Sequence, residues 1–204
     1  MSQISSEASS WDKRYASQEL VWSLQPNQFV EAELKDLPPG KMIDLAGGEG
    51  RNALWFASKG WEVENVEFSK VALDKFQLRA EREGIAKLCI SNHANAETAQ
   101  FSSIPDLVVI AYLQMPIDRL ILALNNAYSQ SRSGTKFFGV WHALRNLKDG
   151  FGGPPIPEML PSPEQLEGWA ASKLNNYKVY EVEREVVVEG QTRVAIDVIL
   201  SGER

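Results

Sequence analysis

Two acidic residues, Asp44 and Glu67, flank the glycine-rich segment AGGEG at positions 46–50. Asp44 closely follows an apolar run, and the residues after the glycines show helical spacing. A second apolar run then stops at Glu67. This order predicts strand, tight turn, helix and strand, which is a βαβ unit with a right-handed crossover. Both acids then lie at the carboxyl ends of neighbouring parallel strands, where such sheets bind ligands.

The residue types in this stretch predict a nucleoside site. Glycines let the backbone turn sharply and let a ligand approach the main chain. The helix that begins near Arg51 points unpaired N–H groups and the positive end of its dipole at the same space, which suits a carboxylate or a phosphate. Glu67 is placed to accept hydrogen bonds from two ribose hydroxyls, and Asp44 to contact a cationic group or to orient water. The two acids favour a ligand that is not densely phosphorylated.

The segment IDLAGGEGRNALWFASKGWEVENVEFS, residues 43–69, resembles the first two motifs of class I S-adenosylmethionine-dependent methyltransferases. The likeness is strongest to the small tellurite-resistance and thiopurine-type branch. It extends over nearly the whole chain, from WDKRY at residues 11–15 to the last expected strand. The resemblance implies a methyltransferase that uses S-adenosylmethionine and releases S-adenosylhomocysteine.

The same resemblance implies a set of cofactor contacts in the first loop and at the following strand ends. They are Asp44, Ala46, Gly47, Gly48, Gly50, Arg51, Asn52, Glu67, Phe68, Asn95, Ala96, Glu97 and Ala111. Two of them depart from the family pattern, because the family usually has glycine at position 46 and aspartate at position 95. Alanine costs little if its φ is negative, so at most weakened or shifted binding is expected. The carbonyl of Asn95 can still accept from the adenine amino group.

The acceptor side of the site is expected at two other strand ends. Tyr112 follows the apolar run DLVVIA, and His142 closes the run TKFFGVW. His142 has the chemistry to remove a proton from an acceptor, or it serves as a polar wall. We predict Tyr112 and His142 as the catalytic residues. The full set predicted to bind the acceptor is Trp11, Tyr15, Trp22, Tyr112, Leu113 and His142, and no metal ligands are predicted.

The three amino-terminal aromatic residues have a second interpretation. The resemblance places this region over the cofactor, where it helps to form the acceptor pocket. Large aromatic side chains can equally cover one face of the sheet. An Asn or Asp followed by two prolines and an aromatic residue is absent after Ala111. In the resembled family that motif serves amino methylation, so nucleic-acid bases and glutamine amides are disfavoured as acceptors.

The residues of the glycine-rich loop leave three other interpretations open. Residues 48–53, GEGRNA, fit the dinucleotide pattern G-x-G-x-x-G/A, so an NAD(P)-dependent oxidoreductase is an alternative. The glycines would also serve a sharp turn without any ligand. A third alternative is a protein that binds S-adenosylmethionine or S-adenosylhomocysteine without catalysis.

The remaining elements predict an α/β, Rossmann-like three-layer sandwich. Helices are expected at residues 27–37, 51–59, 69–83 and 162–173, and a strand at 87–90. Ser162-Pro163-Glu164-Gln165 has the form of a capping box. Two runs around Glu189-Gly190 predict a final hairpin. The result is a seven-stranded, mostly parallel sheet with the last strand antiparallel. The long loop at 143–161 is expected to be a lid or an acceptor wall.

Composition limits the class of protein. The chain has 204 residues, of which 44% are hydrophobic, and this is enough for one domain over residues 11–204 after a disordered tail at 1–10. The net charge of −6 and the lack of a basic block disfavour nucleic acid, so a small-molecule acceptor is expected. The polar amino terminus predicts no signal peptide and no membrane anchor. Cys89 is the only cysteine and is expected to be a reduced core thiol in a cytoplasmic protein. The oligomeric state cannot be predicted from these features.

Overall fold

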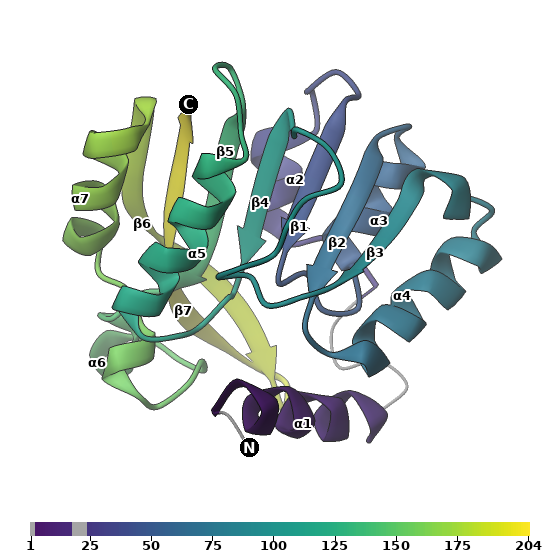
Figure 1. The fold of residues 1–204 in the computed structure, drawn as a ribbon. Helices are drawn as coiled ribbons and strands as arrows, with labels where there is room; N and C mark the ends of the chain where they lie inside the picture. The colour runs from purple at the N-terminus through teal and green to yellow at the C-terminus, as the bar shows by residue number, and fades with distance from the viewer. Residues whose placement is uncertain (1–2, 18–23) are drawn as a thin grey trace.

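A seven-stranded sheet runs through the middle of the molecule, with helices against both faces (Figure 1). This computed structural model describes residues 3–17 and 24–204. The strands are β1 Lys41–Leu45, β2 Glu62–Glu67, β3 Cys89–His93, β4 Leu107–Ala111, β5 Lys136–His142, β6 Asn175–Val188 and β7 Gln191–Glu203. Their order in the sheet is β3-β2-β1-β4-β5-β7-β6, and β7 is antiparallel to both of its neighbours. The predicted Rossmann-like sheet with a reversed last strand is confirmed.

The described helices are α1 Gln3–Ala16, α2 Gln28–Leu34, α3 Arg51–Ser58, α4 Lys70–Arg82, α5 Ile117–Ser129, α6 Asn146–Asp149 and α7 Pro163–Lys173, with short 3-10 helices at Ala86–Leu88 and Pro157–Met159. Helices α5 and α7 pack on one face of the sheet, and α2, α3 and α4 pack on the other. Successive side chains of a strand point to opposite faces. In β5, Phe137 and Trp141 therefore join the first core, and Phe138 and Val140 join the second.

Polar caps begin the helices where the sequence suggests. The side chain of Asn27 accepts from the N–H groups of Phe29 and Val30, and Ser69 accepts from Ala72. Ser162 and Gln165 form both bonds of the predicted capping box at the start of α7. Each cap satisfies a backbone donor that the first turn of a helix leaves unpaired.

The amino-terminal segment corrects the sequence prediction. A disordered tail is expected over residues 1–10, but helix α1 begins at Gln3. The helix is held by its second half, where Tyr15 is 4% exposed and Asp12 accepts a hydrogen bond from the Ser69 hydroxyl at 2.5 Å. A polar segment that continues an anchored helix does not need a core of its own, so composition alone misjudges it.

Two further boundaries differ from the prediction. The third strand is Cys89–His93, preceded by the 3-10 helix Ala86–Leu88, where the sequence predicts a strand at 87–90. The expected loop at 143–161 contains helix α6 and a 3-10 turn. Cys89 is a buried free thiol, as expected for the core, and burial raises its pKa to about 11.

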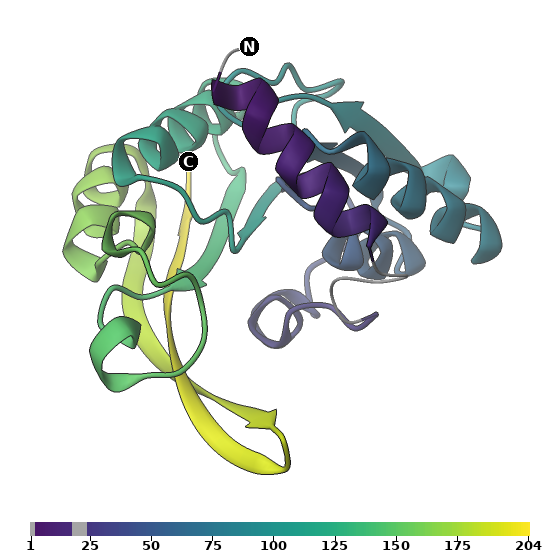
Figure 2. The same cartoon turned by 90° about the horizontal axis from the view of Figure 1, so that it is seen from below.

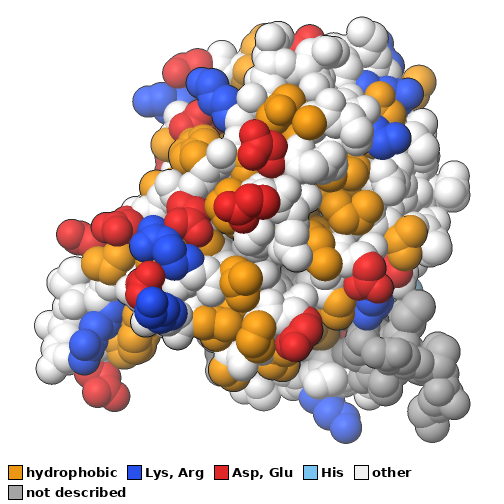
Figure 3. All heavy atoms as spheres, turned by 90° about the vertical axis from the view of Figure 1, so that its left-hand side faces the viewer, with side chains coloured by type: hydrophobic (Ala, Val, Ile, Leu, Met, Phe, Trp, Pro, Cys, Tyr) orange, Lys and Arg blue, Asp and Glu red, His pale blue; other side chains and the backbone are white. Residues whose placement is uncertain are grey.

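The carboxyl-terminal hairpin is long and projects beyond the rest of the sheet (Figure 2). Its two turn residues, Glu189 and Gly190, have φ values of +51° and +75°. Positive φ at both positions matches the twist of paired strands. Strand β6 is an edge of the sheet, and charged and hydrophobic side chains are mixed on this side of the molecule (Figure 3). Charges such as Glu183 and Glu185 on an edge strand oppose edge-to-edge pairing with another chain.

Candidate functional site

The glycine-rich loop between β1 and α3 packs against buried polar side chains. A Cβ atom at Gly47 would lie 2.3 Å from Asn65 Oδ1 and 2.6 Å from Asp44 Cγ, so a larger residue would force the loop to move. Asn65 lies opposite Asp44 in the register of β1 and β2, and its Nδ2 donates to the Gly48 carbonyl at 3.0 Å. Asn65 is fully buried and fixes the loop. Our sequence analysis missed it, although an asparagine inside an apolar strand is a signal.

Gly50 joins the loop to helix α3. Its φ is +72°, and a Cβ atom there would lie 2.2 Å from Phe76 Cδ2. Both facts favour glycine, because a left-handed backbone strains an L side chain and Phe76 occupies the space that a Cβ atom would need. Arg51 then begins α3. The side chain of the next residue, Asn52, is buried and its Oδ1 accepts from the Asn27 N–H at 2.9 Å, which fastens α2 to α3.

Ala46 has a conformation that the sequence analysis did not expect. Its φ is +58°, in the left-handed region, whereas we expected little cost on the assumption of a negative φ. The Cβ of an L-residue is strained there, which explains why glycine suits this position. The expectation that alanine costs little is therefore wrong.

Asp44 is a buried carboxyl group at the carboxyl end of β1. Its Oδ2 accepts from the Ala53 N–H at 3.0 Å, in the first turn of α3. Its Oδ1 has no hydrogen-bond partner among the residues that the structure describes. Burial raises the pKa of Asp44 to about 6, against the opposing effects of the Ala53 N–H and the positive charge of Arg51. Asp44 Oδ1 can therefore accept a hydrogen bond from a ligand or pair with a cationic group.

Glu67 is the corresponding acid at the end of β2. Its Oε2 accepts from the Gly48 N–H at 3.0 Å and its Oε1 from the Ser69 N–H at 2.8 Å. Burial raises its pKa to about 7, although these N–H groups favour the ionised form. A carboxylate has about four acceptor sites, so Glu67 retains acceptor capacity for a ligand. Glu67 thus ties the glycine-rich loop to the start of α4.

The residues predicted to contact adenine gather at the neighbouring end of β3. The Ala94 N–H donates to the Glu67 carbonyl at 3.1 Å, which brings the two strand ends together. Asn95 Oδ1 accepts from the Glu97 N–H at 2.9 Å, and Ala96 is buried. Glu97 itself is paired with Arg119, whose Nε lies 2.9 Å from Oε1. The Asn95 carbonyl thus already has a local donor.

Phe68 connects this segment to β2. Its backbone carbonyl lies 2.9 Å from His93 Nε2. The carbonyl is an acceptor only, so the ring nitrogen carries the hydrogen of this bond. His93 therefore has a structural contact.

Tyr112 and His142 lie side by side at the ends of β4 and β5. Their ring centroids are 4.8 Å apart. Tyr112 has φ +61°, a strained value for a bulky residue, and follows Ala111 directly. Burial, followed by the charge of Asp197, raises the pKa of Tyr112 far above its ordinary value. The phenol therefore stays neutral and does not act as a base at physiological pH.

A buried carboxylate from the hairpin joins these two rings. Asp197 Oδ2 accepts from the Tyr112 hydroxyl at 2.9 Å and from Arg184 Nε at 2.7 Å. His142 Nδ1 lies 2.9 Å from Asp197 Oδ1, although the pair is not aligned as a linear hydrogen bond. Our sequence analysis missed both Asp197 and Arg184. The signal for Asp197 was a single acid inside the apolar run VAIDVIL.

Helix α1 crosses the carboxyl ends of the central strands (Figure 2). Lys75 Nζ donates to the Tyr15 carbonyl at 2.6 Å and pairs with buried Glu49 of the loop at 2.9 Å. Trp11 stacks near Tyr15, with ring centroids 5.6 Å apart. The structure thus brings Trp11 and Tyr15 to the edge that carries the loop. Trp22 lies outside the described residues.

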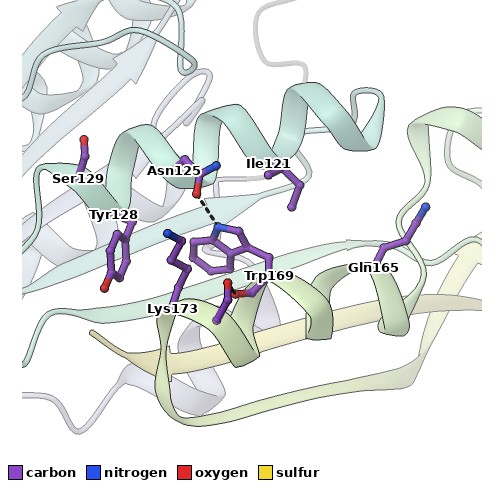
Figure 4. A pocket seen from close by; sticks show the side chains of 8 residues that line it. Ile121, Asn125, Tyr128, Ser129, Gln165, Trp169 and Lys173 are labelled. Atoms are coloured by element: carbon purple, nitrogen blue, oxygen red, sulfur yellow. Dashed lines mark hydrogen bonds between the residues drawn. The ribbon is translucent and has the colours of Figure 1, made fainter.

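A surface pocket of about 560 Å³ lies elsewhere, between α5 and α7 (Figure 4). Trp169 is at its centre and donates from Nε1 to Asn125 Oδ1 at 3.0 Å. None of the residues that line this pocket is a predicted site residue. It is therefore separate from the candidate site at the strand ends.

The family model described as tellurite resistance protein TehB matches residues 12–135, which is more than half of the chain. The chain belongs to the TehB family. The predicted resemblance to this branch of class I S-adenosylmethionine-dependent methyltransferases is thereby confirmed. The matched residues include the glycine-rich loop, Asp44 and Glu67. No curated protein matches the chain.

Solved structures of low sequence identity share the fold. TehB from Haemophilus influenzae is 16% identical with a TM-score of 0.66, and the match covers 88% of this chain and 63% of that one. Another structure is of a protein from the conversion of a disulfide bond into a thioacetal group during echinomycin biosynthesis. It is 17% identical with a TM-score of 0.73, and the match covers 96% of this chain and 91% of that one. The glycopeptide N-methyltransferase MtfA complexed with S-adenosyl-L-methionine is 14% identical with a TM-score of 0.61, covering 87% and 92%.

Over residues 3–17 and 24–204, no helix combines the length and the apolar character needed to cross a lipid bilayer.

Proposed function

We propose that this TehB-family methyltransferase moves a methyl group from S-adenosylmethionine to a small-molecule acceptor at the carboxyl edge of the sheet. The observation that carries the proposal is the pair of buried acids, Asp44 and Glu67, on either side of the glycine-rich loop. A buried polar atom without a partner is costly, and Asp44 Oδ1 has none among the described residues. An ammonium group or a water molecule bound beside the loop would remove that cost. The residues present therefore fit an amino-acid nucleoside.

The remaining cofactor residues follow from this placement. The ribose would bind to the free acceptor sites of Glu67, and the adenine would lie by Phe68, Asn95 and Ala96. The bound cofactor supplies an electrophilic methyl group on a sulfonium. The loop holds the cofactor through its backbone, which is why the conformations of Ala46 and Gly50 matter.

The acceptor would lie between Tyr112, His142 and the amino-terminal helix. Trp11, Tyr15, Ala111 and Leu113 would wall this space. Alignment of the acceptor with the methyl group in a pocket that excludes water supplies much of the rate, potentially about 7 kcal/mol of the barrier. A small molecule fits better than nucleic acid, because the chain carries a net charge of −6.

Isothermal titration calorimetry with S-adenosylmethionine and S-adenosylhomocysteine tests the cofactor site. Asp44→Asn and Glu67→Gln are each expected to weaken binding about 10- to 100-fold, because each removes charged hydrogen bonds. Glu62→Gln is the matched control, since Glu62 lies on the same strand as Glu67 but its side chain is exposed. Wild-type affinity in both acid variants would contradict the proposed site.

A radiolabelled methyl-transfer assay over a panel of small metabolites then tests catalysis. Transfer to at least one thiol, hydroxyl, amine or metalloid acceptor is expected, and it should be lost in Asp44→Asn. Tight binding of the cofactor with no transfer to any acceptor would favour a non-catalytic binding protein. Binding of NAD(P) in place of S-adenosylmethionine would favour the oxidoreductase reading of the loop.

A further inference from the structure

The buried carboxylate of Asp197 contacts three side chains from three different strands or strand ends. Asp197 lies on β7, opposite His142 of β5 in the antiparallel register and opposite Val182 of β6. Its side chain is fully buried, yet it sits in a strand whose neighbours are apolar. An ionised carboxylate in such a place is costly unless it is paired. Its partners are Tyr112, Arg184 and His142.

The two carboxylate oxygens have different roles. Oδ2 accepts from the Tyr112 hydroxyl and from Arg184 Nε. Oδ1 has no aligned hydrogen bond among the described residues, but His142 Nδ1 lies 2.9 Å from it. At this distance the negative carboxylate favours a hydrogen on Nδ1 over a lone pair. The hydrogen of a neutral imidazole therefore belongs on Nδ1, and Nε2 carries the lone pair.

The charge state of Asp197 agrees with this arrangement. Burial alone would raise the pKa of Asp197, but the interactions with His142 and Arg184 outweigh burial and hold it below its ordinary value. Among the described residues, Asp197 of β7 and Tyr112 at the end of β4 lie against His142, and Arg184 of β6 binds Asp197. The positive charge of Arg51, on α3, lowers the pKa of Tyr112 but has a smaller effect than burial. Tyr112 is neutral, so Asp197 is the negative charge that faces the imidazole.

We propose that Asp197 is a positioning residue that holds His142 as the Nδ1–H tautomer. Nε2 is then the atom that takes the proton from the substrate as the substrate receives the methyl group. This inference rests on the proposed function and narrows its acceptor to a group X–H that loses a proton, such as a thiol, a hydroxyl or an amine. The contact of Gly153 with the ring supports a fixed orientation, because a Cβ atom at Gly153 would lie 2.8 Å from His142 Cδ2.

The proton balance of the step is complete. The acceptor atom X uses its electron pair to form the bond to the methyl carbon, and the former S–CH3 pair stays on sulfur. The X–H proton passes to Nε2 of His142. The resulting imidazolium lies against the Asp197 carboxylate, which stabilises its charge, and it later returns the proton to water.

Nitrogen-15 NMR of the histidine rings tests the tautomer without any methyl transfer. The chain has only two histidines, so a His93→Gln variant assigns the signals of His142. At about pH 8, where an ordinary imidazole is neutral, the wild type is expected to show Nδ1–H and a bare Nε2. Asp197→Asn should lose this preference, whereas Arg184→Gln, which removes a partner of the other oxygen, should keep it. A wild-type ring with Nε2–H would overturn the proposal, even if Asp197→Asn fails to fold.

Kinetics with an active acceptor provides the second readout. Asp197→Asn is expected to lower kcat about 100-fold or more, with a much smaller change in KM, because proton transfer rather than binding is impaired. An unchanged kcat would show that Asp197 only stabilises the hairpin. Failure to find any acceptor would refute the proposed function but leave the NMR result valid.

Discussion

Replacing Ala46 by glycine should stabilise the protein, which is the reverse of the usual effect of glycine. The residue has φ +58°, where an L-residue pays about 1–2 kcal/mol. Glycine removes this strain but loses about 0.5–1 kcal/mol through the greater entropy of the unfolded chain. The net gain is about 0.5–1 kcal/mol. For a chain of this size, Tm should rise by about 1–4 °C.

Differential scanning calorimetry of the ligand-free protein measures this change. Ala171→Gly is the matched control, because Ala171 is exposed in the last turn of helix α7 and is not a positive-φ residue. It should lose up to about 1 kcal/mol, since glycine is a poor helix former. A decrease in Tm of the same size in Ala46→Gly would refute the claim that the loop is strained at this residue.

Three other predictions concern the acids, the loop and a helix cap. Because the folded-state pKa values of Asp44 and Glu67 are raised to about 6 and about 7, their contribution to ligand-free stability is full below about pH 4 and is lost as pH rises through those values. Binding has the opposite sign, since the ligand needs the carboxylates. Calorimetric affinity for S-adenosylhomocysteine should fall as pH drops through about 7 and about 6, by up to about tenfold per pH unit for each carboxylate, and a flat pH profile would contradict this. Gly50→Ala should cost about 3 kcal/mol in urea unfolding, from a positive φ plus the contact with Phe76, and a loss below about 1 kcal/mol would mean that the loop relaxes freely. Ser162→Ala should lower the free energy of unfolding by about 1 kcal/mol because it removes the cap of α7, and an unchanged Tm would show that the cap does not stabilise the protein.

The sequence predicts the sheet well because its signals are local. Apolar runs predict most of the parallel strands, and the serine caps predict the starts of α4 and α7. Their partners lie within a few residues, so spacing alone carries the information. The hairpin was predicted for the same reason, because Glu189-Gly190 separates two apolar runs.

The features that the sequence does not predict depend on contacts between distant segments. Helix α1 is anchored through Asp12 and Tyr15, whose partners lie 57 and 60 residues further along the chain. The partner of Tyr112 at Asp197 lies 85 residues away. No local pattern encodes such pairs. The backbone angle of Ala46 was also invisible, because alanine usually has negative φ and only the resemblance marked the position as unusual.

Two of the non-glycine residues with positive φ lie where the chemistry is expected. Ala46 and Tyr112 both have left-handed φ and directly follow β1 and β4, which pair in parallel. Tyr112 keeps its strained conformation through two bonds, from its N–H to the Val140 carbonyl at 2.8 Å and from its hydroxyl to Asp197. Strain of this kind persists only where surrounding contacts over-determine the backbone. The contacts at Tyr112 also orient the phenol beside His142, so the same bonds that hold the strain build the acceptor side of the site. If Asp197 lost its carboxylate, both the strain and the position of the two rings would be released together.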